Sequence, residues 1–270
     1  MELNVCVLHV LSSNNRRWAF MGSASMQGVP LDRIYFSSSP HLGRYENNIR
    51  LVAQAASRDG FPYLEGYGKG LKSQYVQQTA GSMGQIWNYC RIFRHISQTG
   101  QTALVIHDDR MLSMNWHIFK KCVEHLDNKG EFKLFQLRQR TGQPHTIQEQ
   151  IQNNDLSEFD EDNPLNHIIS GLKGYEESMV VTPLGAKFIL DALASNMDNY
   201  FFFDDFIHRK LCELAIGIPG IYCSAKEEYA FVRESLEFAS TTDWAHKDSD
   251  YYEHSKTQSE IQFLEFDNGK

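Results

Sequence analysis

The sequence lacks several features that would assign it to a common class of protein. No run of about 18 apolar residues is present, so no segment is expected to cross a bilayer. The N-terminus has neither the basic region nor the cleavage site of a signal peptide. We therefore expect a cytoplasmic protein, in the host cytoplasm if the chain is viral. The patterns GxxxxGK(S/T), GxGxxG and HExxH are also missing, so no P-loop, dinucleotide fingerprint or HExxH zinc site is predicted.

Cysteine and positive charge are both sparse. The five cysteines form no CxxC pair, which favours reduced, buried thiols over disulfides or a zinc site: Cys6, Cys90, Cys122, Cys212 and Cys223. The formal net charge is −8 at pH 7. Because a protein that coats nucleic acid needs a basic face, this charge argues against that class, although a local basic patch such as Arg138 and Arg140 remains compatible with it.

The composition is that of a globular enzyme-sized domain. The chain has 270 residues, of which 41% are hydrophobic and 22% are charged. No internal repeat or break in composition divides it, so residues 1–240 are predicted to form one domain. Residues 241–270 are polar and charged, and we expect a C-terminal tail or a wrap over the surface.

Apolar runs and helical patterns alternate along the chain, which predicts an α/β fold with a mostly parallel central sheet flanked by helices. Turn residues and glycines separate the elements, and Gly28, Asp59-Gly60 and Gly100 mark three helix ends. The predicted strands are residues 5–10, 33–36, 102–106, 132–137, 178–181 and 218–223, and the predicted helices are residues 18–28, 44–58, 85–98, 115–126, 183–193 and 203–215.

The strongest candidate for a functional site is the acidic pair Asp108–Asp109, directly after the buried strand 102–106. Ligands collect at the carboxyl ends of strands in open α/β sheets. Two adjacent carboxylates are costly to bury unless a cation compensates their charge, and Mg²⁺ or Mn²⁺ prefers such oxygen ligands. The alternative is a solvated turn in which an aspartate caps the following helix.

Four stretches, in order, resemble glycosyltransferase family 25, which includes lipopolysaccharide glycosyltransferases and collagen galactosyltransferases. They are the opening strand with its following arginines, the helix that begins at Gly84, the strand that ends in His107-Asp108-Asp109, and Met179 to Ala186 followed by Asp204-Asp205. The resemblance covers about residues 4–225. It implies a GT-A nucleotide-diphospho-sugar transferase fold and the metal-dependent transfer of a sugar, usually from a UDP-sugar, to an acceptor hydroxyl.

The resemblance also implies roles for the acidic motif. In the family this motif holds a Mn²⁺ or Mg²⁺ ion that bridges the diphosphate, and it contacts the ribose. Asp109 is then the main metal ligand, and Asp108 or His107 reaches the ribose or the metal. This sequence departs from the pattern at His107, where an acidic residue is usual. In GT-A enzymes a C-terminal histidine often completes the metal shell, and His246 is the candidate here.

Further residues are candidates for binding the donor and for catalysis. Arg16 and Arg17 are expected near the diphosphate, while Ser12 and Asn14 are within reach of the uridine or ribose; the alternative is a helix start with two solvated cations. An inverting enzyme needs a carboxylate that accepts the proton of the acceptor hydroxyl. Asp204 or Asp205 is the candidate, with a helix N-cap as the alternative.

Three classes of acceptor stay open: a glycan, which we favour, a protein side chain, and a hydroxylated nucleobase of viral DNA. The competing functions are a nucleotide-sugar-binding or glycan-binding module without catalysis, suggested by His107, and a metal-dependent phosphohydrolase. The phosphohydrolase is disfavoured because the first strand ends in His9-Val10-Leu11-Ser12, without the nucleophilic aspartate that such enzymes use.

Overall fold

The computed structural model describes residues 1–10, 14–39, 46–66, 80–128, 132–137, 164–172, 177–196, 211, 214, 221–225 and 231–234. Strands and helices alternate along most of this chain, as predicted. In chain order the elements are β1 Asn4–Val10, α1 Asn14–Met26, η1 Leu31–Arg33, β2 Ile34–Ser39, α2 Glu46–Arg58, η2 Pro62–Gly66, α3 Ala80–Thr99, β3 Ala103–His107, β4 Arg110–Leu112, α4 Trp116–Asp127, β5 Phe132–Gln136, η4 Pro164–His167, β6 Ile168–Ser170, β7 Ser178–Val181, α6 Pro183–Asn196, β8 Ile221–Ala225 and β9 Val232–Glu234.

The central sheet has seven strands in the order β2-β1-β3-β7-β5-β8-β6. The α/β class is confirmed, but the prediction of a mostly parallel sheet is wrong, because the sheet is mixed. The pairs β1–β2, β1–β3 and β5–β8 are parallel, whereas β3–β7, β5–β7 and β6–β8 are antiparallel. Strand β7 therefore runs in the opposite sense between β3 and β5. A second sheet pairs β4 with β9.

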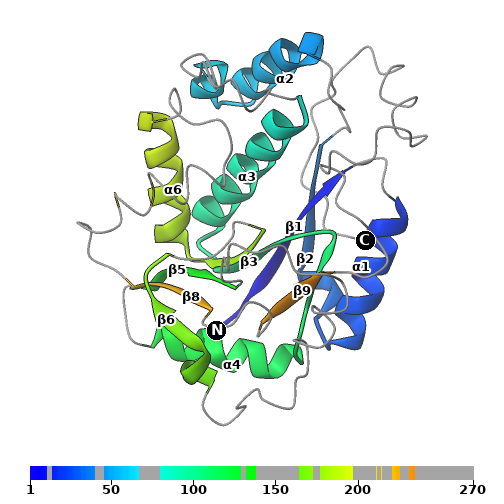
Figure 1. The fold of residues 1–270 in the computed structure, drawn as a ribbon, viewed down its shortest axis with the longest axis vertical. Helices are drawn as coiled ribbons and strands as arrows, with labels where there is room; N and C mark the ends of the chain where they lie inside the picture. The colour runs from blue at the N-terminus through cyan, green and yellow to red at the C-terminus, as the bar shows by residue number, and fades with distance from the viewer. Residues whose placement is uncertain are drawn as a thin grey trace, which may run out of the picture.

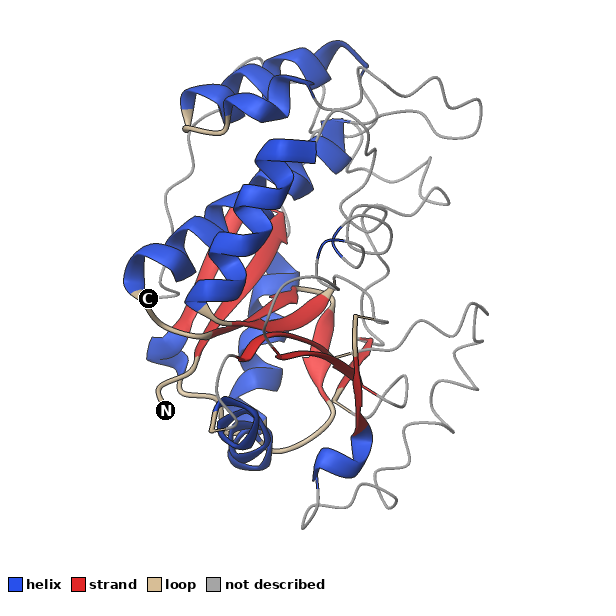
Figure 2. Ribbon diagram, turned by 90° about the vertical axis from the view of Figure 1, so that its left-hand side faces the viewer, coloured by secondary structure: helices blue, strands red, loops and turns tan. Residues whose placement is uncertain are grey.

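The helices cover both faces of the central sheet. Side chains of α2, α3 and α6 form one hydrophobic cluster with Cys6, Val105 and Val181 of the sheet. A second cluster joins α1 and α4 to the other face, where Val7 and Val180 point. Figure 1 shows α2, α3 and α6 above the sheet, α4 below it and α1 at the lower right, and Figure 2 shows the strands between the helices. Among the described helices, none combines the length and apolarity needed to cross a membrane.

Local sequence signals explain where several elements begin and end. Gly28, two residues after the end of α1, and Gly100, directly after α3, adopt positive φ angles of 80° and 69°, the conformation that commonly ends a helix. The side chain of Asn115 caps α4 by accepting a hydrogen bond from the backbone N–H of His117, at 2.9 Å. The four described cysteines are free and buried, as predicted, and Cys212 lies outside the described residues.

Helix α6 approaches the edge of β5 very closely at Gly185. A Cβ atom placed on Gly185 would lie only 2.0 Å from the backbone oxygen of Lys133. Thr182 fixes this approach, because its hydroxyl donates to the backbone oxygen of Phe132 at 2.9 Å and accepts from the backbone N–H of Gly185 at 3.2 Å. Glycine is therefore required at residue 185 by the spacing between helix and strand.

Candidate functional site

The acidic pair occupies a two-residue turn between β3 and β4, at the carboxyl ends of the parallel strands β1, β2 and β3. Both side chains are buried, with 6% of Asp108 and 5% of Asp109 exposed. The sequence predicted this edge of the sheet correctly. The alternative, in which an aspartate caps the next helix, is wrong because β4 intervenes and Asn115 caps α4.

Asp108 makes three hydrogen-bonding contacts with neighbouring elements. His9, near the end of β1, places its Nδ1 atom within hydrogen-bond distance of Oδ2 of Asp108, at 2.8 Å. Arg16 of α1 donates from Nη1 to Oδ1 at 3.1 Å. The backbone N–H of Asp108 donates to the oxygen of Leu8 at 3.1 Å. Asp108 therefore ties β1, α1 and the turn after β3 together.

Asp109 has much weaker contacts than its neighbour. Its Oδ1 atom is buried and accepts no hydrogen bond from the described residues. The nearest cations are Nε of Arg110, 3.7 Å from Oδ1, and Nη1 of Arg16, 4.0 Å from Oδ2. Both distances exceed the 2.7–2.9 Å, roughly, of a charge-assisted hydrogen bond. A buried carboxylate in this state favours an additional positive ligand.

Arg110 and Glu177 extend the group of charges around Asp109. Arg110 is buried and donates from Nη2 to Oε1 of Glu177 at 2.9 Å, while the Glu177 side chain is 20% exposed. The backbone oxygen of Glu177 also accepts from the backbone N–H of His107 at 3.0 Å. Glu177, directly before β7, is thus fixed against the end of β3 by its backbone and against Arg110 by its side chain.

His107 faces the other side of the sheet. Its Nε2 atom lies 2.7 Å from the hydroxyl of Tyr89 in α3. Burial lowers the pKa of His107 below its usual 6.5, and the nearby Asp109 and Glu177 carboxylates oppose this shift only in part. We conclude that His107 is neutral at pH 7 and that one of its two ring nitrogens is engaged by Tyr89.

The remaining predicted residues are scattered around this group or lie beyond it. Arg16 reaches Asp108, but the guanidinium of Arg17 lies over the ring of Phe36, 4.6 Å from its centroid. The alternative of two solvated cations is wrong for Arg16, which is 5% exposed. Asn14 is exposed at the start of α1. Four other candidates lie outside the described residues: Ser12, Asp204, Asp205 and His246.

Two residues that contact this group, His9 and Glu177, were not predicted. His9 lies within an apolar run, and Glu177 precedes a strand without any recognisable motif. His9 and Asp108 lie side by side because the parallel register pairs Leu8 with His107, and the only sign of this in the sequence is that each follows an apolar run. No comparable sequence signal locates Glu177, because it reaches the site through the antiparallel strand β7.

The described residues do not form a complete metal cage. Within those ranges, no three His, Cys, Asp or Glu side chains are grouped so that they would hold a metal ion by themselves. Asp109 alone has a buried carboxylate oxygen without a hydrogen bond at this turn. One carboxylate fits the way Mg²⁺ is usually bound, through one or two carboxylates together with water and substrate phosphates.

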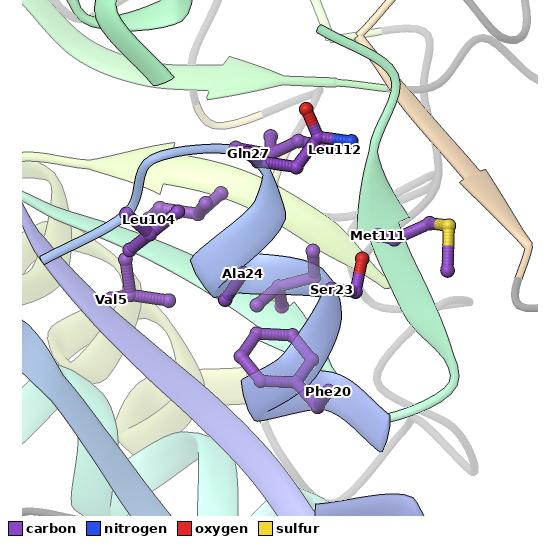
Figure 3. A pocket seen from close by; sticks show the side chains of 10 residues that line it. Val5, Phe20, Ser23, Ala24, Gln27, Leu104, Met111 and Leu112 are labelled. Carbon is purple, nitrogen blue, oxygen red and sulfur yellow. The ribbon is translucent and has the colours of Figure 1, made fainter. Parts of the chain in front are cut away.

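A separate apolar crevice lies between α1, the sheet and β4. It is small, with a volume of about 20 Å³, which is room for roughly one water molecule. Figure 3 shows Phe20 and Ala24 of α1, Val5 and Leu104 of the sheet and Met111 of β4 around it. None of the ten lining residues is charged, so this crevice does not offer a place for a metal ion or a diphosphate.

Comparison with known proteins finds distant likeness among solved structures. No family model matches the chain, and no curated protein sequence matches it. Among solved structures, the apo form of mouse xyloside xylosyltransferase 1 is similar, with a TM-score of 0.39 and 12% sequence identity over 81% of this chain and 83% of that chain. A likeness at this TM-score carries no argument about activity.

Proposed function

We propose that this protein is a metal-dependent glycosyltransferase with a GT-A-like fold, which moves a sugar from a nucleotide-sugar, in the first instance a UDP-sugar, to an acceptor hydroxyl. The observation that carries the proposal is Asp109, a buried carboxylate in the turn after strand β3 with no hydrogen bond to its Oδ1 from the described residues. Such a group is costly in an apoprotein and is relieved by a divalent cation.

The charges around Asp109 suit a donor that brings both a cation and a diphosphate. Arg16 and Arg110 place guanidinium groups near the two carboxylate oxygens of Asp109, 4.0 Å from Oδ2 and 3.7 Å from Oδ1. Guanidinium groups bind phosphate oxygens well and stabilise the negative charge that develops as the diphosphate leaves. A divalent cation would add Lewis-acid stabilisation of the same charge. Asp109 is the residue that would hold it.

We assign different roles to Asp108 and Asp109 because their contacts differ. Asp108 already accepts hydrogen bonds from His9 and Arg16, so we assign it to organising the site. Asp109 has no such partner for Oδ1 among the described residues, so we assign it to the metal. Asp204 or Asp205 stays the candidate for the base that accepts the proton of the acceptor, and both lie outside the described residues.

The second candidate function is a nucleotide-sugar-binding module without catalysis. It is favoured by His107, a neutral side chain engaged by Tyr89 at the position where a carboxylate is usual in the resembling family. A module of this kind would bind a nucleotide diphosphate with Mn²⁺ but would not release it from the sugar. Only the glycosyltransferase needs an acceptor, and this could be a glycan, a protein side chain or a hydroxylated nucleobase.

A panel of nucleotide-sugars tests the proposal. The melting temperature of the protein is measured with UDP-, GDP-, CMP- and dTDP-sugars, each with and without Mn²⁺, since a ligand that binds only the folded state raises it. We expect one nucleotide-sugar to raise the melting temperature only when Mn²⁺ is present, and the same mixture to release the free nucleotide slowly. A stabilised but unhydrolysed donor would favour the module, and no stabilisation by any donor would refute both functions.

A further inference from the structure

We propose that Glu177 and Asp108 are positioning residues that hold Arg110 and Arg16 away from Asp109 and so keep Asp109 open to a divalent cation. The inference rests on the proposed function, because it assigns a task to the charges around the same metal site. It concerns two side chains that would not contact the metal themselves.

Each carboxylate oxygen of Asp109 has one arginine near it, beyond hydrogen-bond distance. On one side, Arg110 donates to Glu177 at 2.9 Å and its Nε stays 3.7 Å from Asp109. On the other side, Arg16 donates to Asp108 at 3.1 Å and its Nη1 stays 4.0 Å from Asp109. Each arginine is therefore hydrogen-bonded to a different carboxylate and only approaches the central one.

These distances call for an explanation, because all of these side chains are largely buried. A buried carboxylate beside two guanidinium groups should attract at least one of them into a hydrogen bond, since ion pairs are stronger away from water. An arginine that closed on Asp109 would place its positive charge where the cation must bind. The competing carboxylates of Glu177 and Asp108 prevent this closure, and they leave both guanidinium groups beside the metal position, where an incoming diphosphate needs them.

Glu177 is the better of the two residues for a test. Asp108 also accepts from His9 and lies within the turn itself, so its replacement changes several contacts. The backbone oxygen of Glu177 pairs with His107 whatever its side chain is. Replacing Glu177 by glutamine preserves the shape and that backbone bond, and removes the charge that holds Arg110.

The experiment measures Mn²⁺ binding by calorimetry to the full chain and to Glu177→Gln, Arg110→Met and the double variant. We expect Glu177→Gln to weaken Mn²⁺ binding by roughly 10-fold or more, within the range found for residues that support metal ligands. Arg110→Met should bind Mn²⁺ at least as well as the wild type. The double variant should recover this affinity, because no arginine is left on that side to close on Asp109.

The recovery separates positioning from a merely structural role. If Glu177 only supported the fold, the double variant would bind Mn²⁺ as poorly as Glu177→Gln, and the melting temperature of both metal-free proteins would fall; that pattern overturns the inference. Wild-type affinity in Glu177→Gln would overturn it as well. If the wild type itself bound no Mn²⁺, alone or with UDP, the metal-dependent function would fail first, and the inference with it.

Discussion

Replacing Gly185 by alanine should force α6 away from β5. The new methyl group would lie 2.0 Å from the backbone oxygen of Lys133 and 2.9 Å from its carbonyl carbon. Neither atom belongs to a flexible side chain, so the helix or the strand has to move by about 1.5 Å to reach an ordinary contact distance. The movement also strains the hydrogen bonds through which the hydroxyl of Thr182 links the start of α6 to β5.

The cost is the sum of three terms. Overpacking a buried contact costs about 1–3 kcal/mol, and loss of a helix cap costs about 1 kcal/mol more. The higher helix propensity of alanine returns up to about 1 kcal/mol. The net loss in the free energy of unfolding is therefore about 1–3 kcal/mol, which lowers the melting temperature by roughly 2–12 °C in a domain of this size.

Gly22 provides a matched control, because it lies in α1 with nothing within 4 Å of a Cβ atom. The same substitution there should raise the free energy of unfolding by about 0.5–1 kcal/mol, since alanine favours the helix and meets no obstacle. Thermal and urea unfolding of both variants measure the difference. The packing argument is refuted if Gly185→Ala is as stable as the wild type or if the two variants change stability in the same direction.

Two further predictions concern the interior between α2, α3 and β2. Burial lowers the pKa of His95 below its usual 6.5, so the unfolded chain binds a proton more readily there, and stability present above pH 6.5 is lost as the pH falls through the folded-state value. His95→Phe keeps an aromatic ring against Tyr35 and removes the titrating group, so the free energy of unfolding, measured by urea titration, should fall less between pH 7.5 and pH 5.0 than in the wild type. An equal fall in both proteins would contradict this prediction. Asp59 accepts from Trp87 at 2.8 Å and from Arg94 at 2.7 Å, so Asp59→Ala should cost about 3 kcal/mol, and a loss under about 1 kcal/mol would show that these bonds are replaceable.

The sequence predicted most elements because their signals are local. A run of apolar residues marked the strand that ends at His107, and Gly28 and Gly100, which adopt positive φ angles in the structure, marked the ends of α1 and α3. The prediction started α3 at residue 85, whereas the helix begins at Ala80, because the polar first turn of this helix resembles a loop. Strands β4 and β9 were not predicted, since three residues are too few to show a period.

The direction of β7 could not be predicted from its own residues. All four of its residues are buried, which is equally compatible with a parallel or an antiparallel strand. Its reversed direction places its first residues, rather than its last, at the edge where the acidic pair lies. Glu177 reaches Arg110 for this reason, and a mostly parallel sheet would have placed it at the opposite edge.

The sequence predicted the position of the acidic pair but not the different contacts of its two carboxylates. The sequence located Asp108 and Asp109 at the carboxyl edge of a buried strand, and the structure agrees. Their different environments follow from contacts with His9, Arg16 and Arg110, which come from three elements. No pattern within the motif distinguishes a carboxylate that is already hydrogen-bonded from one that is open to a cation.

The most direct test of the central claim compares Asp109→Asn with the matched variant Asp32→Asn, which changes an exposed aspartate in η1. Release of UDP from the UDP-sugar that stabilises the wild type is measured with and without Mn²⁺, together with the melting temperature of each metal-free protein. We predict Mn²⁺-dependent release by the wild type and Asp32→Asn, and none by Asp109→Asn although it stays folded. Mn²⁺-dependent release at the wild-type rate by Asp109→Asn would contradict the assignment of Asp109 as the metal ligand.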